Sequence, residues 1–531
     1  MEGVGERDSL MVSSGWHRLA LDAWPSPLPQ GANEAWTGWS SVPSSEEEWP
    51  SDKRRLLHDV LERQYAAAGL VAPPSLSGLL RSGCRAVVVG HQLVLGGGPA
   101  FFHHKILTAI RTARQLETRW GTPVVPVFWM ASEDHDWKEI ATLAGSRHDH
   151  FWKPVDEDVP HPVGMRSLDG VQDVLQSWGA DGAPAEEAQA LLDDLAIAQE
   201  VGETLSGVFR RWLHRWYGAD QLLVLDPMDE SLKKSASALW AAEFEGAGVH
   251  AALMGSAEAS GPAMVRENNV FWLEPVQGRI GVVRDSGGWK AGSWGMSDPT
   301  EGWSAWAHQH AAQCSPGVLL RPLYQEWLLH SAAVVLGPGE WSYWHQVPAA
   351  FERHGVTFPA LRLRDHGVVK SPEVHAVGWR LEDGWMHDEV WDRWILDTWM
   401  EEHGTALQSL EANMQTWLNQ AVDLSSDVVP SASGATGALE SGVQKAWAQW
   451  LKKVRRSLKG QRAEAWGEAR RACEFLMRRG VPQDRWANWH VLAGSSLEAA
   501  RWREAWLVND GELMTRVWCF GPSGEKSPSL D

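Results

Sequence analysis

The chain has 531 residues, a length that predicts roughly two or three domains and a large buried core. Its 48 basic and 68 acidic residues give a formal net charge of −20, which argues against a general nucleic-acid or anionic-membrane surface. Four widely spaced cysteines form no CxxC pair, as is typical of a reducing cytosol. No apolar run reaches the roughly 18–20 residues that cross a bilayer, and the first residues show no secretory signal. We therefore expect a cytoplasmic protein.

The first part of the chain alternates between helical and strand patterns. Apolar residues recur with a helical period through residues 46–70, and a short apolar strand follows at 85–92. A glycine turn then leads into a predicted helix at 100–120 and a second strand at 122–131. Strand, helix and strand over this length form a βαβ unit, which predicts an α/β fold with a parallel sheet and a right-handed crossover.

The later strands and helices are shorter. Further strands are predicted at 221–227, 270–276, 279–285, 317–323 and 332–340, and helices at 186–217 and 229–246. The hairpin signals "VQGR" and "DSGGW" predict that residues 261–300 form an antiparallel insertion.

Beyond residue 388 the pattern becomes helical. Apolar residues there recur at steps of three and four, which is a heptad seam: Leu407, Leu410, Met414, Trp417 and Ala421. A loop of small residues at 425–438 separates this helix from a second one with the same spacing, so an antiparallel helical hairpin is expected. We favour an interaction arm over a catalytic role for this hairpin.

Three domains are predicted from these patterns. They are a core at 1–388 that includes the antiparallel insertion, a helical hairpin or coiled-coil arm at 389–480, and a C-terminal helical segment at 481–531 that packs back on the core.

The first cluster of polar residues lies in "GHQLVLGGGPAFFHHK", where the first predicted strand ends. Three glycines, Gly96, Gly97 and Gly98, enter a helix, and exposed N–H groups at such a place favour an anion. A tight turn is an equally good interpretation. Hydrogen-bond donors nearby complete the cluster: His91, Gln92, His103, His104 and Lys105.

The second cluster is "SEDHDWKE", at the end of the second predicted strand. Glu133, Asp134, His135 and Asp136 have the chemistry to ligate a divalent metal, orient an amine or relay protons. A helix N-terminus explains one or two acids at this place, but not a histidine between two aspartates. We therefore interpret the run as a site.

The third cluster lies in "LLRPLYQEWLLHSAAVVLGPGEWSYWHQ". Arg321 is predicted to end a strand and suits a carboxylate or phosphate, with polar residues following it: Gln325, Glu326, Glu340 and Tyr343. No Ser–His–Asp, HExxH or Cys–His pattern is present, so a hydrolase nucleophile is not indicated. The residues alone predict an α/β enzyme with a charged small-molecule substrate.

At these clusters the sequence resembles the bacillithiol biosynthesis family BshC. The matching segments are "VVVGHQLVLGGGPAFFHHKILTAI", "GTPVVPVFWMASEDHDWKEI" and "SPGVLLRPLYQEWLLHSAAVVLGPGEWSYWHQVPAAF". The resemblance implies a Rossmann-like core with inserted connecting segments and a C-terminal coiled-coil arm through which two copies form a homodimer. It also implies a ligase that joins the carboxylate of L-cysteine to the amine of glucosaminyl-malate.

The resemblance further implies roles for individual residues. Lys105 and the glycine turn would neutralise an anionic group, and Arg321 would hold the malyl carboxylates. The run Asp134–Asp136 would bind the amine or a magnesium ion, and a carboxylate or His135 would take the amine proton. Amide formation needs an activated carboxylate, so ATP (giving ADP or AMP) with Mg²⁺ is the expected cofactor pair, while no resident metal is assigned.

Two other interpretations remain open at this point. One is an enzyme of the same fold that acts on a different amine acceptor. Two departures from the family pattern motivate it, since the family usually has glutamine where this chain has His91 and proline where it has His330. The other is a non-catalytic dimeric binding scaffold that keeps the arm and a vestigial pocket. Lys105 and the EDHD run argue against the scaffold, because buried charges without a function are costly.

Overall fold

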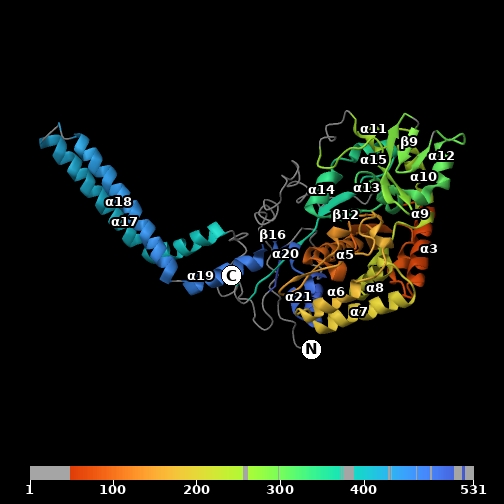
Figure 1. The fold of residues 1–531 in the computed structure, drawn as a ribbon, viewed down its shortest axis with the longest axis horizontal. Coiled ribbons are helices and arrows are strands. Elements are labelled where there is room, and N and C mark those ends of the chain that lie inside the picture. Colours follow the sequence, from red (N-terminus) through yellow and green to blue (C-terminus); the bar gives the residue numbers. More distant parts are fainter. Residues whose placement is uncertain are drawn as a thin grey trace. The chain divides into compact units, whose positions relative to one another are not determined.

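The computed structural model describes residues 48–254, 261–286, 288–296, 298–371, 374, 388–428, 431, 433–461, 463–478, 481–507 and 517–520. The chain forms two compact units (Figure 1). The first contains the described residues up to Val369 and from Asp484 onward, and the second contains those between them. The N-terminal residues that show no secretory signal lie outside the described part of the chain.

A five-stranded parallel sheet forms the centre of the first unit. Its strands are β1 (Arg85–His91), β2 (Val124–Met130), β5 (Leu223–Leu225), β12 (Ala333–Leu336) and β13 (Ala360–Leu363). Their spatial order is β13-β12-β1-β2-β5, and each neighbouring pair is parallel. Every residue of β2 is buried, as expected for a strand covered on both faces. The predicted α/β class with a parallel sheet is confirmed.

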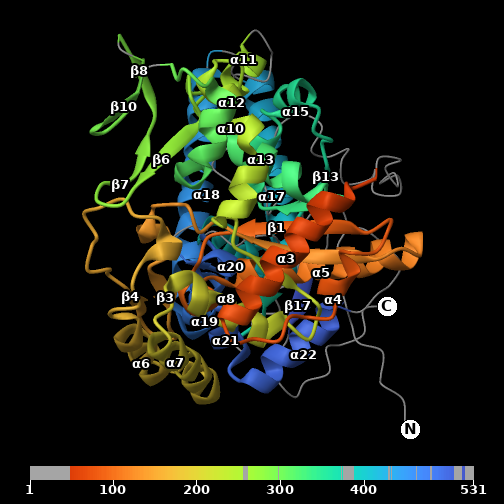
Figure 2. The same ribbon diagram turned by 90° about the vertical axis from the view of Figure 1, so that its right-hand side faces the viewer.

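Helices cover both faces of this sheet (Figures 1 and 2). Val87 and Val89 of β1 face one core, and Ala86 and Val88 face the other, as the two-residue period of a strand requires. The helices of the first core are α5 (Ala100–Trp120), α6 (Val171–Ala180), α7 (Ala185–Glu200), α8 (Leu205–Tyr217), α21 (Trp489–Ala493) and α22 (Ser496–Leu507). The helices of the second core are α3 (Ser51–Ala67), α4 (Ser75–Gly78), α9 (Glu230–Ser235), α10 (Ser237–Phe244), α11 (Val249–Leu253), α12 (Trp303–Gln309), α13 (Leu320–Leu329), α14 (Pro338–Trp344) and α15 (Pro348–His354).

The strand predicted at 317–323 is wrong. Helix α13 begins at Leu320, so Arg321 lies in the first turn of a helix and does not end a strand. A short apolar run does not distinguish a buried strand from a buried helix by its periodicity, which is why the prediction failed here. The strand predicted at 332–340 ends earlier, at Leu336, and residues 338–340 already belong to helix α14.

Antiparallel strands lie within the predicted insertion at 261–300, and the strand Cys314–Pro316, which lies beyond these bounds, pairs with them. One sheet contains β6 (Val270–Glu274), β7 (Gly278–Gly281) and β11 (Cys314–Pro316), and the other contains β8 (Val283–Asp285), β9 (Gly288–Ala291) and β10 (Trp294–Met296). Smaller pairs are formed by β3 (Thr142–Ala144) with β4 (Asp149–Phe151), and by β14 (His366–Val369) with β17 (Val517–Phe520).

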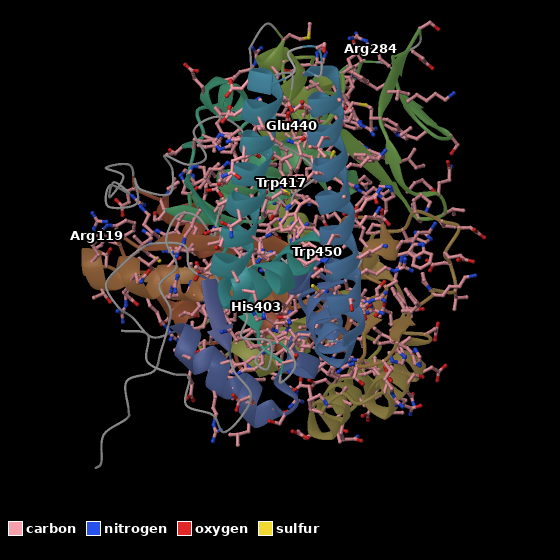
Figure 3. All side chains as sticks on the ribbon, turned by 90° about the vertical axis from the view of Figure 1, so that its left-hand side faces the viewer. Arg119, Arg284, His403, Trp417, Glu440 and Trp450 are labelled. Carbon is pink, nitrogen blue, oxygen red and sulfur yellow. The ribbon has the colours of Figure 1, made fainter. Side chains whose placement is uncertain are left out.

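The second unit is mostly helical. It contains α17 (Asp388–Val428), α18 (Ser433–Gln461), α19 (Ala463–Leu476) and the short pair β15 (Met477–Arg478) and β16 (Val481–Pro482). Helices α17 and α18 lie side by side (Figures 1 and 3) and extend into the predicted loop at 425–438.

The packed face of α17 differs from the predicted heptad seam. Leu407 and Leu418 are buried, whereas Leu410 and Trp417 are half exposed. A coiled coil and the predicted domain boundaries therefore stay predictions. Among the described residues, no helix combines the length and the apolar character needed to cross a membrane.

Candidate active site at the carboxyl edge of the sheet

Successive strands of the chain are added to one side of β1 and then to its other side, so β1 and β12 flank the point at which the strand order reverses. From β1 the chain passes through α5 to β2 and later to β5, whereas β12 and β13 lie on the other side of β1. Open α/β sheets bind ligands outside the carboxyl ends of their strands at such a switch point. The residues that follow β1, β2 and β12 are therefore the candidates for chemistry.

Lys105, in the second turn of α5, connects β1 with α14. Its Nζ donates to the Gly90 carbonyl at 2.5 Å and forms an ion pair with Glu340 in the first turn of α14. Arg321 donates from Nη2 to the Tyr343 hydroxyl at 2.6 Å. Arg321 also lies against β1, because a Cβ atom at Gly90 would be 3.5 Å from its Nη1. The structure thus brings together four of the predicted site residues.

This cluster carries more positive than negative charge. Burial lowers the pKa of Lys105, although the adjacent Glu340 opposes the shift. Burial alone would raise the pKa of Glu340, but Lys105 and Arg321 outweigh it and hold that pKa below its ordinary value. Burial raises the pKa of Tyr343 to about 12, so its hydroxyl keeps its proton. One carboxylate faces two cations, which favours an anionic ligand.

Arg364, directly after β13, adds a third cation near this cluster. Its Nη1 donates to Asp484 at 2.8 Å, and its guanidinium lies 5.1 Å from the centre of the Phe101 ring. His91, at the end of β1, has its Nδ1 3.0 Å from the Gln92 carbonyl. Burial, together with the charges of Lys105 and Arg364, lowers the pKa of His91 to about 4. His91 is therefore neutral at physiological pH.

Gln92 joins two carboxylates that follow β2. Its Nε2 donates to Asp134 Oδ2 at 2.8 Å and to Glu139 Oε2 at 2.5 Å. Burial opposes ionisation of Asp134, but the Gln92 hydrogen bond and the charge of Arg279 outweigh it and lower its pKa. Burial and the charge of Asp134 raise the pKa of Glu139. Two carboxylates whose pKa values move apart are suited to different roles, one ionised and one that exchanges a proton.

His135 contacts the inserted sheet. Its Nδ1 lies 3.0 Å from Arg279 Nη1 and 3.7 Å from Asp134 Oδ1. The guanidinium of Arg279 in turn lies 4.0 Å from the centre of the Phe271 ring. Burial and the charge of Arg279 lower the pKa of His135, so the imidazole is neutral.

The two remaining acids of the EDHD run have structural partners. Glu133 is buried and forms an ion pair with Lys233 of α9, which is fully buried as well. Asp136 is exposed and caps the short helical turn Trp137–Glu139 by accepting from Lys138 N at 3.2 Å. Only Asp134 and His135 of the run therefore remain as candidates for contact with a ligand.

The glycine turn is packed by atoms of the chain itself. Gly96, Gly97 and Gly98 all have positive φ, at 53°, 81° and 54°. A Cβ atom at Gly97 would lie 2.4 Å from His103 Nε2, and Asn488 donates to the carbonyls of Gly96 and Gly98 at 3.1 and 2.9 Å. A tight turn accounts for these glycines, and their role in nucleotide or anion binding stays a prediction.

His103 and His104 are buried among aromatic side chains. His103 Nδ1 lies 2.6 Å from the Tyr217 hydroxyl, and its ring stacks on Trp489. His104 stacks on Trp506, and its Nδ1 lies 3.7 Å from the carboxylate of Asp484. These contacts give both histidines a role in packing, and no ligand role for them is supported by the geometry.

Gln325 and Glu326 lie behind Arg321. Gln325 Oε1 accepts from Arg321 Nη1 at 3.0 Å, and its Nε2 donates to Glu326 at 2.8 Å. Glu326 also accepts from the Ser331 backbone at 2.8 Å. Both side chains are fully buried, so they orient Arg321. His330, one of the departures from the family pattern, precedes β12 and therefore lies at the opposite edge of the sheet.

The described residues do not assemble a metal site at the switch point. Within the described ranges, the one group of three close ligand atoms lies on α3 and comprises the half-buried His58 and the exposed Asp59 and Glu62. Glu133 is paired with Lys233, Asp136 caps a turn, and His135 Nδ1 faces the Arg279 guanidinium, so the EDHD run does not offer the three ligands that a resident metal needs. Burial raises the pKa of Cys84 and of Cys314 to about 12, so neither thiol is an activated nucleophile.

Several residues of the site were not predicted from the sequence. Glu139 stands five residues after Asp134 and was detectable as another acid near the EDHD run. Arg279, Lys233 and Arg364 contact the site from elements distant in the sequence; for example, 144 positions separate Arg279 from His135. No local pattern marks such residues, because their positions depend on the packing of the inserted sheet and α9.

The chain is similar to a known family over most of its length. The family profile described as "Bacillithiol biosynthesis BshC, N-terminal Rossmann-like domain" matches residues 34–365. Curated relatives carry the name "Putative cysteine ligase BshC". They include proteins from Salinibacter ruber (30% identical, covering 52% of this chain and 53% of the relative), Flavobacterium psychrophilum (26%, 66% and 67%) and Geobacillus thermodenitrificans (28%, 56% and 58%).

The match spans about half the length of the Salinibacter relative. The family profile, at residues 34–365, covers all five strands of the parallel sheet and each of the three polar clusters. The described switch point, with Lys105, Asp134 and Arg321, therefore lies wholly within the matched Rossmann-like domain. The chain belongs to the BshC family of bacillithiol biosynthesis.

Proposed function

We propose that this protein is a ligase that joins the carboxylate of L-cysteine to the amine of glucosaminyl-malate, the last step of bacillithiol biosynthesis. The observation that carries the proposal is the pairing of two oppositely charged clusters at one sheet edge. A cationic cluster lies between β1 and β12, an acidic cluster follows β2, and His91 and Gln92 at the tip of β1 lie between them. An acceptor with carboxylates at one end and an amine at the other matches this arrangement.

In this proposal the cationic cluster binds the malyl group. Arg321 is held by Tyr343 and Gln325, so its guanidinium is oriented before a substrate arrives. A planar guanidinium binds a carboxylate through two hydrogen bonds, and Lys105 adds a second positive charge. Burial lowers the pKa of Lys105, and the ion pair with Glu340 opposes this shift and favours the charged ammonium.

The acidic cluster then binds and deprotonates the amine. Asp134 has a lowered pKa and holds the ammonium group as an ion pair. Glu139 has a raised pKa and accepts the proton that the ammonium group loses. The free amine attacks the activated carbonyl carbon of cysteine, so a C–N bond forms and the bond to the activating group breaks.

Activation of the cysteine carboxylate is proposed to come from ATP with Mg²⁺, through an acyl adenylate or acyl phosphate. An amide does not form from an unactivated carboxylate at neutral pH, and this requirement supports a phosphorylated leaving group. The cysteine thiol belongs to the substrate, in agreement with the buried state of Cys84 and Cys314. Such thiols suit the reducing cytoplasm, where we propose that the protein acts.

The test is a reconstitution with the purified full-length chain. L-cysteine, glucosaminyl-malate, ATP and Mg²⁺ are added, and bacillithiol is measured by mass spectrometry after fluorescent labelling of thiols. We expect product from the unaltered protein. Glu139→Gln should lower kcat by roughly 100-fold, as is usual for the loss of a general base. Asp134→Asn should raise KM for the amine. Asp193→Asn, which changes an exposed carboxylate of α7, is the matched control.

Other outcomes would change the assignment. Product with another amino sugar, but none with glucosaminyl-malate, would replace the acceptor and keep the ligase. Absence of an amide with every amine tested, together with an unchanged thiol profile in a deletion strain, would favour a binding scaffold.

We also propose that two copies associate through α17 and α18. Trp417 of α17 and Trp450 of α18 are 51% and 43% exposed, which is unusual for such large apolar side chains (Figure 3). Sedimentation of the full chain should give a dimer. The double variant Trp417→Glu/Trp450→Glu should give a monomer, and a dimer that survives both changes would move the interface elsewhere.

A further inference from the structure

Arg279 is held in one orientation by four neighbours. Its Nε donates to Ser315 Oγ at 2.9 Å, and its Nη2 donates to the Pro316 carbonyl at 2.7 Å. The Phe271 ring covers the guanidinium at 4.0 Å, and Nη1 contacts His135 Nδ1 at 3.0 Å. The side chain is 9% exposed, so water does not compete for these bonds. The position of Nη1 against the imidazole is therefore well defined.

This contact determines which imidazole nitrogen of His135 carries the proton. A guanidinium has only donors, so the nitrogen that it faces must be an acceptor without a proton. Asp134 is the competing partner of Nδ1, but its Oδ1 is 3.7 Å away, beyond hydrogen-bond distance. A neutral imidazole with an unprotonated Nδ1 has its proton on Nε2. No residue in the described part of the chain forms a hydrogen bond with His135 Nε2, which leaves this N–H for a ligand.

We propose that His135 acts through Nε2–H as a hydrogen-bond donor to the oxygen that gains negative charge during amide formation, and that Arg279 is the positioning residue that enforces this tautomer. The role rests on the proposed function. When the amine attacks the activated carbonyl, the C=O electron pair moves to oxygen, and Nε2–H donates to that oxygen without transferring its proton. The pair returns as the leaving group departs. His135 is then not the base, and the amine proton goes to Glu139.

The tautomer is measured directly, without substrate. The chain is labelled with ¹⁵N-histidine, and the His135 signals are identified as those missing in His135→Gln. Long-range ¹H–¹⁵N correlation spectra should show an unprotonated Nδ1 and a protonated Nε2. In Arg279→Met the proton should move partly to Nδ1. Arg279→Lys should retain the original tautomer, because an ammonium group also only donates. Arg284→Met, in the same insertion with a 55% exposed side chain (Figure 3), should change nothing.

Kinetics separate a donor from a base. Glutamine places an amide N–H at the position of Nε2, whereas asparagine places one at the position of Nδ1. We expect His135→Asn to lower kcat by roughly 100-fold with little change in KM, as for the loss of an oxyanion donor, and His135→Gln to lose much less. Arg279→Met should lower kcat by no more than His135→Asn.

Two results would overturn the inference. A proton on Nδ1 in the unaltered protein removes its basis, whatever the activity. Equal losses in His135→Gln and His135→Asn would indicate a base or a structural role. A failure of the proposed function can be told apart from these results. If Nε2 carries the proton but no amide product forms, the ligase assignment is contradicted and the assigned tautomer of His135 still holds.

Discussion

Lys105 and Glu340 form an ion pair across 235 positions of sequence, between the second turn of α5 and the first turn of α14. The Lys105 ammonium also donates to the Gly90 carbonyl at the end of β1. The Lys105 side chain therefore connects both strands of the switch point. It contacts β1 through the Gly90 carbonyl, and it contacts β12 through Glu340 in the helix that follows that strand. The pair stabilises the edge at which we place the anionic part of the substrate.

Removing the Lys105 ammonium group should leave the Glu340 carboxylate without its closest cation. We expect Lys105→Met to lower the free energy of unfolding by about 3 kcal/mol, because breaking a buried pair leaves a charge uncompensated. The double variant Lys105→Met/Glu340→Gln should recover part of this loss. Urea unfolding followed by tryptophan fluorescence measures both. If the double variant lost as much unfolding free energy as the two single variants, Lys105→Met and Glu340→Gln, lose together, the two side chains would not interact.

The stability of the core should depend on pH through His91. Its folded-state pKa of about 4 lies below the ordinary value of 6.5, so between these pH values the unfolded chain binds a proton that the folded chain does not. The contribution of His91 is therefore complete above pH 6.5 and is lost as the pH falls toward 4, at up to about 1.4 kcal/mol per pH unit. His91→Asn keeps a donor near the Nδ1 position and should flatten the unfolding free energy in this window. An identical pH profile in the variant would contradict the prediction.

Gly97 should tolerate no side chain. Its φ is +81°, and a Cβ atom would lie 2.4 Å from His103 Nε2. We expect Gly97→Ala to lower the free energy of unfolding by at least about 2 kcal/mol, from backbone strain and overpacking together. Gly69→Ala is the matched control, with φ at +59° and no atom within 4 Å, and should cost about 1 kcal/mol. Equal losses at the two positions would mean that the contact with His103 relaxes.

Asn488 should connect the C-terminal residues to the glycine turn. Its Nδ2 donates to two turn carbonyls, and its Oδ1 caps α21 by accepting from His490 N at 2.9 Å. Asn488→Ala should cost about 2 kcal/mol, since it removes the cap and both donors. Asn488→Ser keeps a capping oxygen and should cost about 1 kcal/mol less. The melting temperatures of the two variants give this difference, and no difference would mean that the cap contributes nothing.

The local pattern of residues determined the parallel sheet of this protein. Continuous apolar runs such as "RAVVVGHQ" and "TPVVPVFWMA" require burial on both faces, so the strands β1 and β2 and the helix between them were predictable. The polar residues at the tips of these strands were predictable too, since a core does not accept unpaired charges. Where the pattern was ambiguous, as at Leu320–Leu329, a buried helix was taken for a strand.

Only the tertiary structure decided which of these polar residues share a site. The sequence placed Glu133 and Asp134 side by side, yet Glu133 pairs with the buried Lys233, whereas Asp134 accepts from Gln92. Arg279 reaches His135 because the inserted sheet packs against the end of β2, and no local period encodes that contact. Short-range patterns report burial and backbone conformation, whereas partners far apart in sequence are chosen by packing. For this reason the sequence determined where the chemistry lies, and the fold determined which atoms can perform it.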